Sequence, residues 1–215
     1  MVPDASSGLR LTFAITGASG SVFAAEMLRV LAADSRVACV DLVVSDAALR
    51  VFAEEMQLSG RNGLIEKLFS ANSAGASPVQ APAQTEKFTQ HTETDIGAAI
   101  ASGSCRSSGM IVLPCSMGTL AGIANGLASN LIERAADVTL KERRPLVLCI
   151  RETPFNRIHL RNMQLASDAG ATIFPVMPTF YNHPQSAEEM ARNFVHRVLT
   201  HIGLPQAGAY EWKGE

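Results

Sequence analysis

Short, strongly apolar runs alternate along the chain with segments in which apolar residues recur at helical spacing. Four of the runs have the length and composition of strands covered on both faces: residues 11–15, 37–44, 109–113 and 146–150. Strands that alternate with helices predict a three-layer α/β/α fold around a doubly wound, mainly parallel sheet of the Rossmann or flavodoxin kind. The length of 215 residues predicts a single domain over residues 1–215.

The remaining pattern predicts shorter elements and the helices between the strands. The expected short elements are a helical turn or two at 64–69, a short or edge strand at 88–93, a short helix at 95–101 and a last strand at 173–175. The expected helices follow residue 20, cover 46–56, start near 120 and 130, and cover 155–169 and 186–201. Residues 57–84 are rich in Ser, Ala, Gly and Pro and predict a mobile surface insertion, and residues 203–215 form a C-terminal tail.

The composition argues against several classes of function. A net charge of −2 and an aromatic content of 6% argue against nucleic-acid binding. No apolar run reaches the length of a transmembrane helix, and the N-terminus lacks the pattern of a signal peptide, so we expect no membrane and a cytoplasmic location. The four cysteines are scattered, without a CxxC pair or a His/Cys cluster at ligand spacing, which predicts reduced thiols and no metal site.

Small and hydroxylated residues mark two strand-to-helix joints. The first is TGASGS at 16–21 and the second is PCSMGT at 114–119. Such turns let backbone N–H groups at a helix start face an anion, so we favour a phosphate or mononucleotide role for the first over a plain turn with a serine cap. For the second, two helix caps alone explain Ser116 and Thr119 equally well. Neither joint has the GxGxxG, GxxxxGK[ST] or GxSxG pattern.

A third joint lies in the stretch 134–161, where RETP follows the run LVLCI. Ligands of open α/β sheets bind beyond the carboxyl ends of the strands, so Arg151 and Glu152 are candidates for binding or catalysis. The alternative is a solvated loop with a cap at Thr153 and Pro154 at the first helical position. Glu55, near the end of the helix at 46–56, is open to a solvated or a functional interpretation.

Several motifs together resemble one known family. They are TGASG (16–20), SGS (102–104), LPCSMGTL (113–120), RAADVTLKERRPLVL (134–148), RETP (151–154), HLRNM (159–163) and PTFYNHPQS (178–186). Over residues 11–212 the chain resembles the UbiX/Pad1 flavin prenyltransferases of the FMN-binding flavoprotein group. The resemblance implies an enzyme that joins the dimethylallyl group of dimethylallyl phosphate to N5 and C6 of reduced FMN without a metal. It also implies a homododecamer and a UbiD-type decarboxylase as recipient of the prenyl-FMN product.

The same resemblance assigns roles to individual residues. It implies FMN binding by Gly17, Ala18, Ser19, Ser45, Ser116, Met117, Gly118, Thr119 and Arg151. For the prenyl phosphate it implies Lys141, Arg151, Tyr181 and Arg197, with Trp212 helping to close the prenyl pocket. Proton transfer is assigned to Ser19, Glu55 and Glu152. The family site lies between subunits, so residues from distant stretches can serve a neighbour's ligand.

Two positions depart from the family pattern. Gly118 stands where Lys is usual and removes a positive charge, and Cys105 stands where Phe is usual. These departures keep open a non-catalytic FMN-binding or delivery protein. An FMN-dependent cysteine-type decarboxylase of the same fold ranks lower, because such enzymes need an early His base and a PASANT-like motif, and this chain has Phe23 and its neighbours where that His would be.

Overall fold

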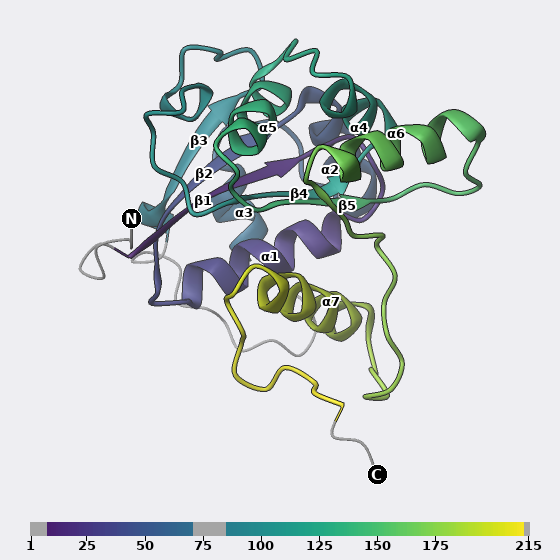
Figure 1. Cartoon of the computed structure of the whole chain (residues 1–215). Helices are drawn as coiled ribbons and strands as arrows, with labels where there is room; N and C mark the ends of the chain where they lie inside the picture. Colours follow the sequence, from purple (N-terminus) through teal and green to yellow (C-terminus); the bar gives the residue numbers. More distant parts are fainter. Residues whose placement is uncertain (1–7, 71–84, 213–215) are drawn as a thin grey trace.

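A six-stranded, all-parallel sheet forms the centre of the molecule in a computed structural model that describes residues 8–70 and 85–212 (Figure 1). The strands are β1 (Leu9–Ile15), β2 (Val37–Val44), β3 (Phe88–Thr92), β4 (Met110–Cys115), β5 (Leu146–Ile150) and β6 (Thr172–Ile173). Their order is β3-β2-β1-β4-β5-β6, the order of a Rossmann fold. The expected fold class is therefore confirmed.

Helices cover both faces of the sheet. They are α1 (Ser21–Ala33), α2 (Asp46–Met56), α3 (Leu64–Ser70), α4 (Met117–Ala124), α5 (Leu131–Lys141), α6 (Arg157–Asp168) and α7 (Ala187–His201), with 3-10 turns at Thr85–Lys87 and Ala99–Ala101. Helices α1 and α7 lie on one side of the sheet, and α4, α5 and α6 lie on the other (Figure 1). Two apolar core clusters result, one on each face, because successive strand residues point in opposite directions.

Side-chain caps fix where most helices begin. Ser45, Ser116, Asn130 and Ser186 each accept a hydrogen bond from the backbone N–H three residues later. These bonds satisfy N–H groups that a helix leaves without intrahelical acceptors. Each of these helices therefore starts directly after its capping residue.

Several predicted boundaries are wrong. Helix α4 begins at Met117 and not near residue 120, because Ser116 is its cap. Residues 95–101 form only the 3-10 turn Ala99–Ala101, because Ile100 is the one residue of that turn that is buried. Helix α6 begins after Asn156, whose side chain accepts from His159 N, and not at a Thr153 cap. The last strand covers Thr172–Ile173, and Phe174 and Val176 continue along β5 through single backbone hydrogen bonds.

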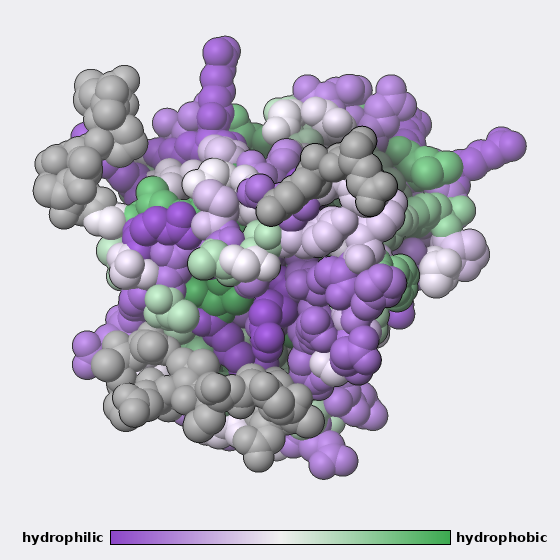
Figure 2. Space-filling view, turned by 90° about the horizontal axis from the view of Figure 1, so that it is seen from below, coloured by the Kyte–Doolittle hydropathy of each residue, from purple (hydrophilic) through white to green (hydrophobic). Residues whose placement is uncertain are grey.

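Within the predicted insertion at 57–84, residues 64–70 form α3, which agrees with the expected helical turns. Leu64 and Leu68 are buried in the core, so this part is not a surface insertion. Residues 71–84 lie outside the described residues. Within residues 8–70 and 85–212, no helix is long and apolar enough to cross a membrane. Figure 2 shows the α1–α7 side, a mainly hydrophilic face with hydrophobic residues in patches between the polar ones.

Candidate functional site

Two loops meet where the direction of the strand order reverses, between β1 and β4. Thr16, directly after β1, is 2% exposed and joins them. Its Oγ1 donates to Pro114 O at 2.7 Å and accepts from Ser116 N at 2.8 Å. Open α/β sheets bind ligands in the crevice at this point. Thr16 was not among the predicted site residues, although its place after a buried strand was visible in the sequence.

The N-terminus of α1 already faces an anion, the carboxylate of Glu55 from α2. Gly20 N donates to both Glu55 oxygens at 3.1 Å, and Ser21 N donates to Oε2 at 2.7 Å. Burial would raise the pKa of Glu55, but hydrogen bonds from Ser19, Ser21 and Gly20 outweigh it and hold the pKa below its usual value. Glu55 therefore serves as the cap that Gly20 cannot provide.

The N-terminus of α4 is open by comparison. Ser116 Oγ accepts from Thr119 N at 3.3 Å and lies 3.1 Å from Thr119 Oγ1. Among the described residues, the N–H groups of Met117 and Gly118 have no acceptor, as expected for the first turn of a helix. A Cβ on Gly118 would meet only Ser116 Oγ at 4.0 Å, so the space in front of this turn is free. A phosphate group fits this end.

A small cavity of about 360 Å³ brings together three predicted residues, Ser19, Glu55 and Arg151. Arg151 follows β5, and its backbone N–H donates to Cys115 O at 3.2 Å, which holds the β5 end beside the β4 loop. Glu152 is exposed next to it and accepts from Thr153 N at 2.9 Å. Ser45 follows β2, the strand beside β1, and caps α2 by accepting a hydrogen bond from Ala48 N.

A second cavity of about 740 Å³ lies between α7 and the C-terminal tail and contains Tyr181, Arg197 and Trp212. The Tyr181 ring lies 5.6 Å from the Trp212 ring in an edge-on arrangement and is stacked on Tyr210 at 6.3 Å. The tail thus contributes aromatic walls to this cavity, Trp212 among them. Asn193 Nδ2 and His196 Nδ1, two buried atoms on residues that line this cavity, have no hydrogen-bond partner in the described structure.

One short segment, residues 176–179, forms a wall of both cavities. Val176 and Pro178 line the small cavity, whereas Met177 and Thr179 line the large one. Alternate residues of this segment therefore face opposite sides. The two groups of predicted residues are therefore neighbours across a thin partition.

Lys141 is the predicted residue that the structure places elsewhere. It ends α5, which leads into the amino end of β5, whereas Arg151 follows the carboxyl end of the same strand. A strand of five to seven residues separates the two edges by about 20 Å. Within one chain, Lys141 and Arg151 thus lie at opposite edges of the sheet.

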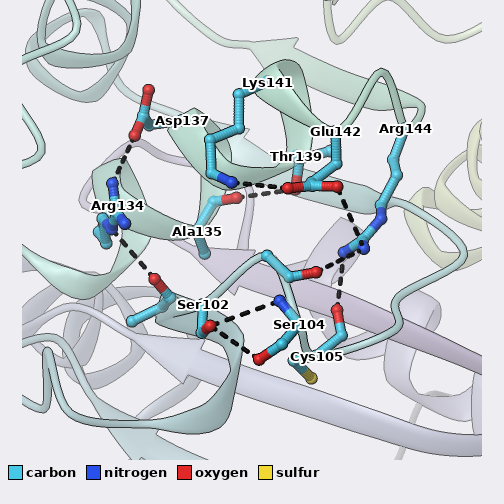
Figure 3. Close-up of polar contacts among 12 residues, drawn as sticks. Ser102, Ser104, Cys105, Arg134, Ala135, Asp137, Thr139, Lys141, Glu142 and Arg144 are labelled. Carbon is cyan, nitrogen blue, oxygen red and sulfur yellow. Dashed lines mark hydrogen bonds and ion pairs between the residues drawn. The ribbon is translucent and has the colours of Figure 1, made fainter.

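Two arginines around Lys141 hold the loop that contains the SGS motif. Arg144 donates to Cys105 O at 2.7 Å and to Gly103 O at 3.0 Å, and Arg134 Nε donates to Ala101 O at 3.0 Å (Figure 3). The sequence predicts no role for Arg144, and the structure shows that it holds this loop. Sequence spacing gave no signal for it, because the contact joins positions about 40 residues apart.

Comparison with known proteins gives one consistent result. The sequence model described as Flavoprotein matches residues 2–197. The flavin prenyltransferase UbiX of Pseudomonas aeruginosa is 42% identical over 204 residues, which cover 94% of this chain and 93% of the relative.

Two solved UbiX-like structures are similar to this chain over nearly its whole length. A dodecameric structure from Escherichia coli O157:H7, described as an FMN-dependent UbiX-like decarboxylase, has a TM-score of 0.80 and 37% identity over 96% of this chain and all of that chain. The structure of AnUbiX (PadA1) in complex with FMN and dimethylallyl pyrophosphate has a TM-score of 0.81 and 36% identity over 97% of this chain and 99% of that chain.

Proposed function

The chain belongs to the Flavoprotein family and, within it, to the UbiX flavin prenyltransferases; on this premise we propose that it joins the dimethylallyl group of dimethylallyl phosphate to N5 and C6 of reduced FMN. The observation that carries the proposal is the pair of adjacent cavities that share the segment 176–179 as a wall. One contains Ser19, Glu55 and Arg151, and the other contains Tyr181, Arg197 and Trp212. The first suits the flavin side of the reaction and the second suits the prenyl donor.

The residues around the switch point suit FMN. The open N–H groups of Met117 and Gly118, with the hydroxyls of Ser116 and Thr119, would hold its phosphate. Further contacts would come from the other predicted residues at this edge, namely Gly17, Ala18, Ser19, Ser45 and Arg151. When bound, reduced FMN supplies the nucleophilic nitrogen and carbon that receive the prenyl group.

The donor requires cations, because an allylic phosphate leaves as a dianion. Arg197 and Arg151 provide positive charge from the two cavities, and the Tyr181 hydroxyl can donate a hydrogen bond to a phosphate oxygen. The rings of Tyr181 and Trp212 would lie against the five-carbon chain and stabilise the allylic cation with their faces.

Protons must leave the flavin and reach the departing phosphate. Glu55, held ionised by the hydrogen bonds from Ser19, Gly20 and Ser21, would take up a proton released by the flavin and pass it through the Ser19 hydroxyl to the departing phosphate. Glu152 is exposed beside Arg151 and would serve as the proton acceptor near the flavin ring.

Lys141 would reach the donor phosphate from a second copy of the chain, since its own chain places it at the other edge of the sheet. We therefore propose a homo-oligomer, with the dodecamer of the Escherichia coli relative as its form. Lys141→Ala and Arg197→Ala variants, each inactive alone, would restore about a quarter of the sites when mixed in one oligomer, because a random neighbour pair is complete one time in four. A mixture without activity would place both residues in one chain.

The test of the reaction itself is to incubate the protein with reduced FMN and dimethylallyl phosphate without oxygen and to follow the mass of the flavin. Prenylated flavin is the expected product. A flavin of unchanged mass with both the phosphate and the pyrophosphate would contradict the proposal. Flavin binding without turnover would favour the FMN-delivery alternative, and loss of carbon dioxide from a cysteine-containing peptide would favour the cysteine-type decarboxylase.

The setting of the reaction follows from its chemistry. Prenyl-FMN would pass to a UbiD-type decarboxylase as its cofactor. All four cysteines are free, which suits the reducing cytoplasm that we propose as the location. To test the recipient, the protein carrying prenyl-FMN is mixed with such a decarboxylase in its apo form, and the gain of decarboxylase activity is measured.

A further inference from the structure

The ammonium group of Lys141 is held in place by the next residue along the chain. Lys141 Nζ lies 2.6 Å from Glu142 Oε1, and both side chains are partly exposed (Figure 3). An ammonium group has three N–H donors, and no other described residue accepts from this one. Two donors therefore remain for a ligand while the third fixes the direction of the group.

Gly103 provides the surface on which this ion pair rests. A Cβ built on Gly103 would lie 2.6 Å from Lys141 Nζ and would overlap Glu142 Oε1. The absence of a side chain at residue 103 is thus required for the observed position of both charged groups. Because both are the far ends of flexible side chains, a methyl group at this position would move them without disturbing the backbone.

Arg144 links the carboxylate to the same loop. Its Nη2 lies 4.0 Å from Glu142 Oε2 and 3.0 Å from Gly103 O. The negative charge of Glu142 is thereby shared between two cations, and the cluster of Lys141, Glu142 and Arg144 keeps a net charge of +1. Repulsion between Glu142 and an incoming phosphate is offset by Arg144.

We propose that Glu142 and Gly103 are positioning residues for the prenyl-phosphate site: together they fix the Lys141 ammonium where it meets the phosphate bound to a neighbouring copy. The inference rests on the proposed function, which assigns Lys141 to that phosphate. A free lysine side chain loses its rotational freedom when it binds a ligand, whereas a lysine already fixed by Glu142 loses less. The effect is therefore on the binding of the donor and not on the chemical step.

The test compares Glu142→Ala and Gly103→Ala with wild type in the complete oligomer. Each change is expected to raise the KM for dimethylallyl phosphate about threefold, in line with the small effects of exposed ion pairs, and to leave kcat and FMN affinity unchanged. Glu142→Gln keeps a hydrogen-bond acceptor for Lys141, so its KM for dimethylallyl phosphate should be close to that of the wild type. Calorimetric titration with inorganic phosphate gives the same comparison without turnover.

Matched controls are available on the same chain. Gly97→Ala adds a methyl group whose nearest neighbour would be Asp95 Oδ1 at 3.7 Å, and Glu66→Gln removes an exposed carboxylate on α3. Neither should change KM, and thermal unfolding shows whether any variant has lost stability. An unchanged KM in an active Gly103→Ala enzyme, or a KM lowered by Glu142→Ala, overturns the inference. An inactive wild-type protein instead overturns the proposed function.

Discussion

The joints β1–α1 and β4–α4 have the same local construction, yet their helix ends differ in what they face. At α1 the N–H groups of Gly20 and Ser21 donate to the carboxylate of Glu55. At α4 only a serine cap is present, and the N–H groups of Met117 and Gly118 remain open among the described residues. Whether a helix N-terminus can bind an external anion therefore depends on two things. One is the turn itself, and the other is whether a side chain from a distant part of the sequence already occupies the N–H groups.

The largest effect is expected when α4 is made to resemble α1. Gly118→Asp would place a carboxylate where we propose that the FMN phosphate binds. Repulsion between the Asp carboxylate and the FMN phosphate should weaken FMN binding about 100-fold, which corresponds to roughly 2.7 kcal/mol. Stability should not fall, because an acidic residue suits the first turn of a helix and glycine does not. FMN titration and thermal unfolding measure both, with Gly118→Asn as the uncharged control; equal losses in the two variants would exclude the electrostatic cause.

The next effect concerns the residue that joins the two joints. Thr16→Val would remove a buried donor to Pro114 O and a buried acceptor for Ser116 N. We expect a loss of about 2 kcal/mol in the free energy of unfolding and weaker FMN binding. Thr139→Val is the control, since that buried hydroxyl donates only to a carbonyl of its own helix and to sulfur. Urea unfolding that ranks the control as the more damaging change would refute this role of Thr16.

A smaller effect is expected when the anion is removed from α1. Glu55→Gln should lower the free energy of unfolding by about 1 kcal/mol at neutral pH, the usual value of a helix cap. Because the pKa of Glu55 is lowered in the folded protein, its contribution is present above the unfolded value of about 4.3 and is lost as pH falls through the folded value. Urea titrations at neutral and acidic pH should show the wild type and the variant converging in acid. A constant difference, or the same behaviour in Glu54→Gln, would contradict the assignment.

The smallest effect sharpens the comparison by adding charge to the open joint. Gly118→Lys introduces a cation into free space beside the α4 end. FMN binding should tighten about threefold at low salt, and the gain should shrink as ionic strength rises. Gly118→Gln separates charge from helix propensity in the same fluorescence titration. A gain that is independent of salt would argue against a phosphate near residue 118.

The sequence was sufficient for the parts of the fold that local chemistry decides. Strand β2 and helix α2 have the predicted bounds, because an apolar run ends directly at Ser45 and that serine caps the helix. Prediction failed at 95–101, where the 3-10 turn buries only Ile100 and no periodic apolar face exists to stabilise a helix.

The candidate site was predictable as a set of residues but not as an arrangement. Motif resemblance named Ser19, Glu55 and Arg151, yet their meeting in one cavity depends on contacts between α1, α2 and the end of β5. The hydrogen bonds from Gly20 and Ser21 to Glu55 span 34 or 35 residues, a distance at which spacing carries no information. The position of Lys141 at the far edge, by contrast, follows from chain order alone, because Lys141 precedes the strand that Arg151 follows.

Because residues 176–179 line both cavities, ligand binding in one cavity can be coupled thermodynamically to ligand binding in the other. A ligand that moves this segment on binding in one cavity changes the shape of the other, since Val176 and Pro178 face one side while Met177 and Thr179 face the other. Any factor by which the donor strengthens flavin binding must equal the factor by which flavin strengthens donor binding. A ligand that moves this segment when it binds first therefore changes the affinity of the other cavity for the second ligand.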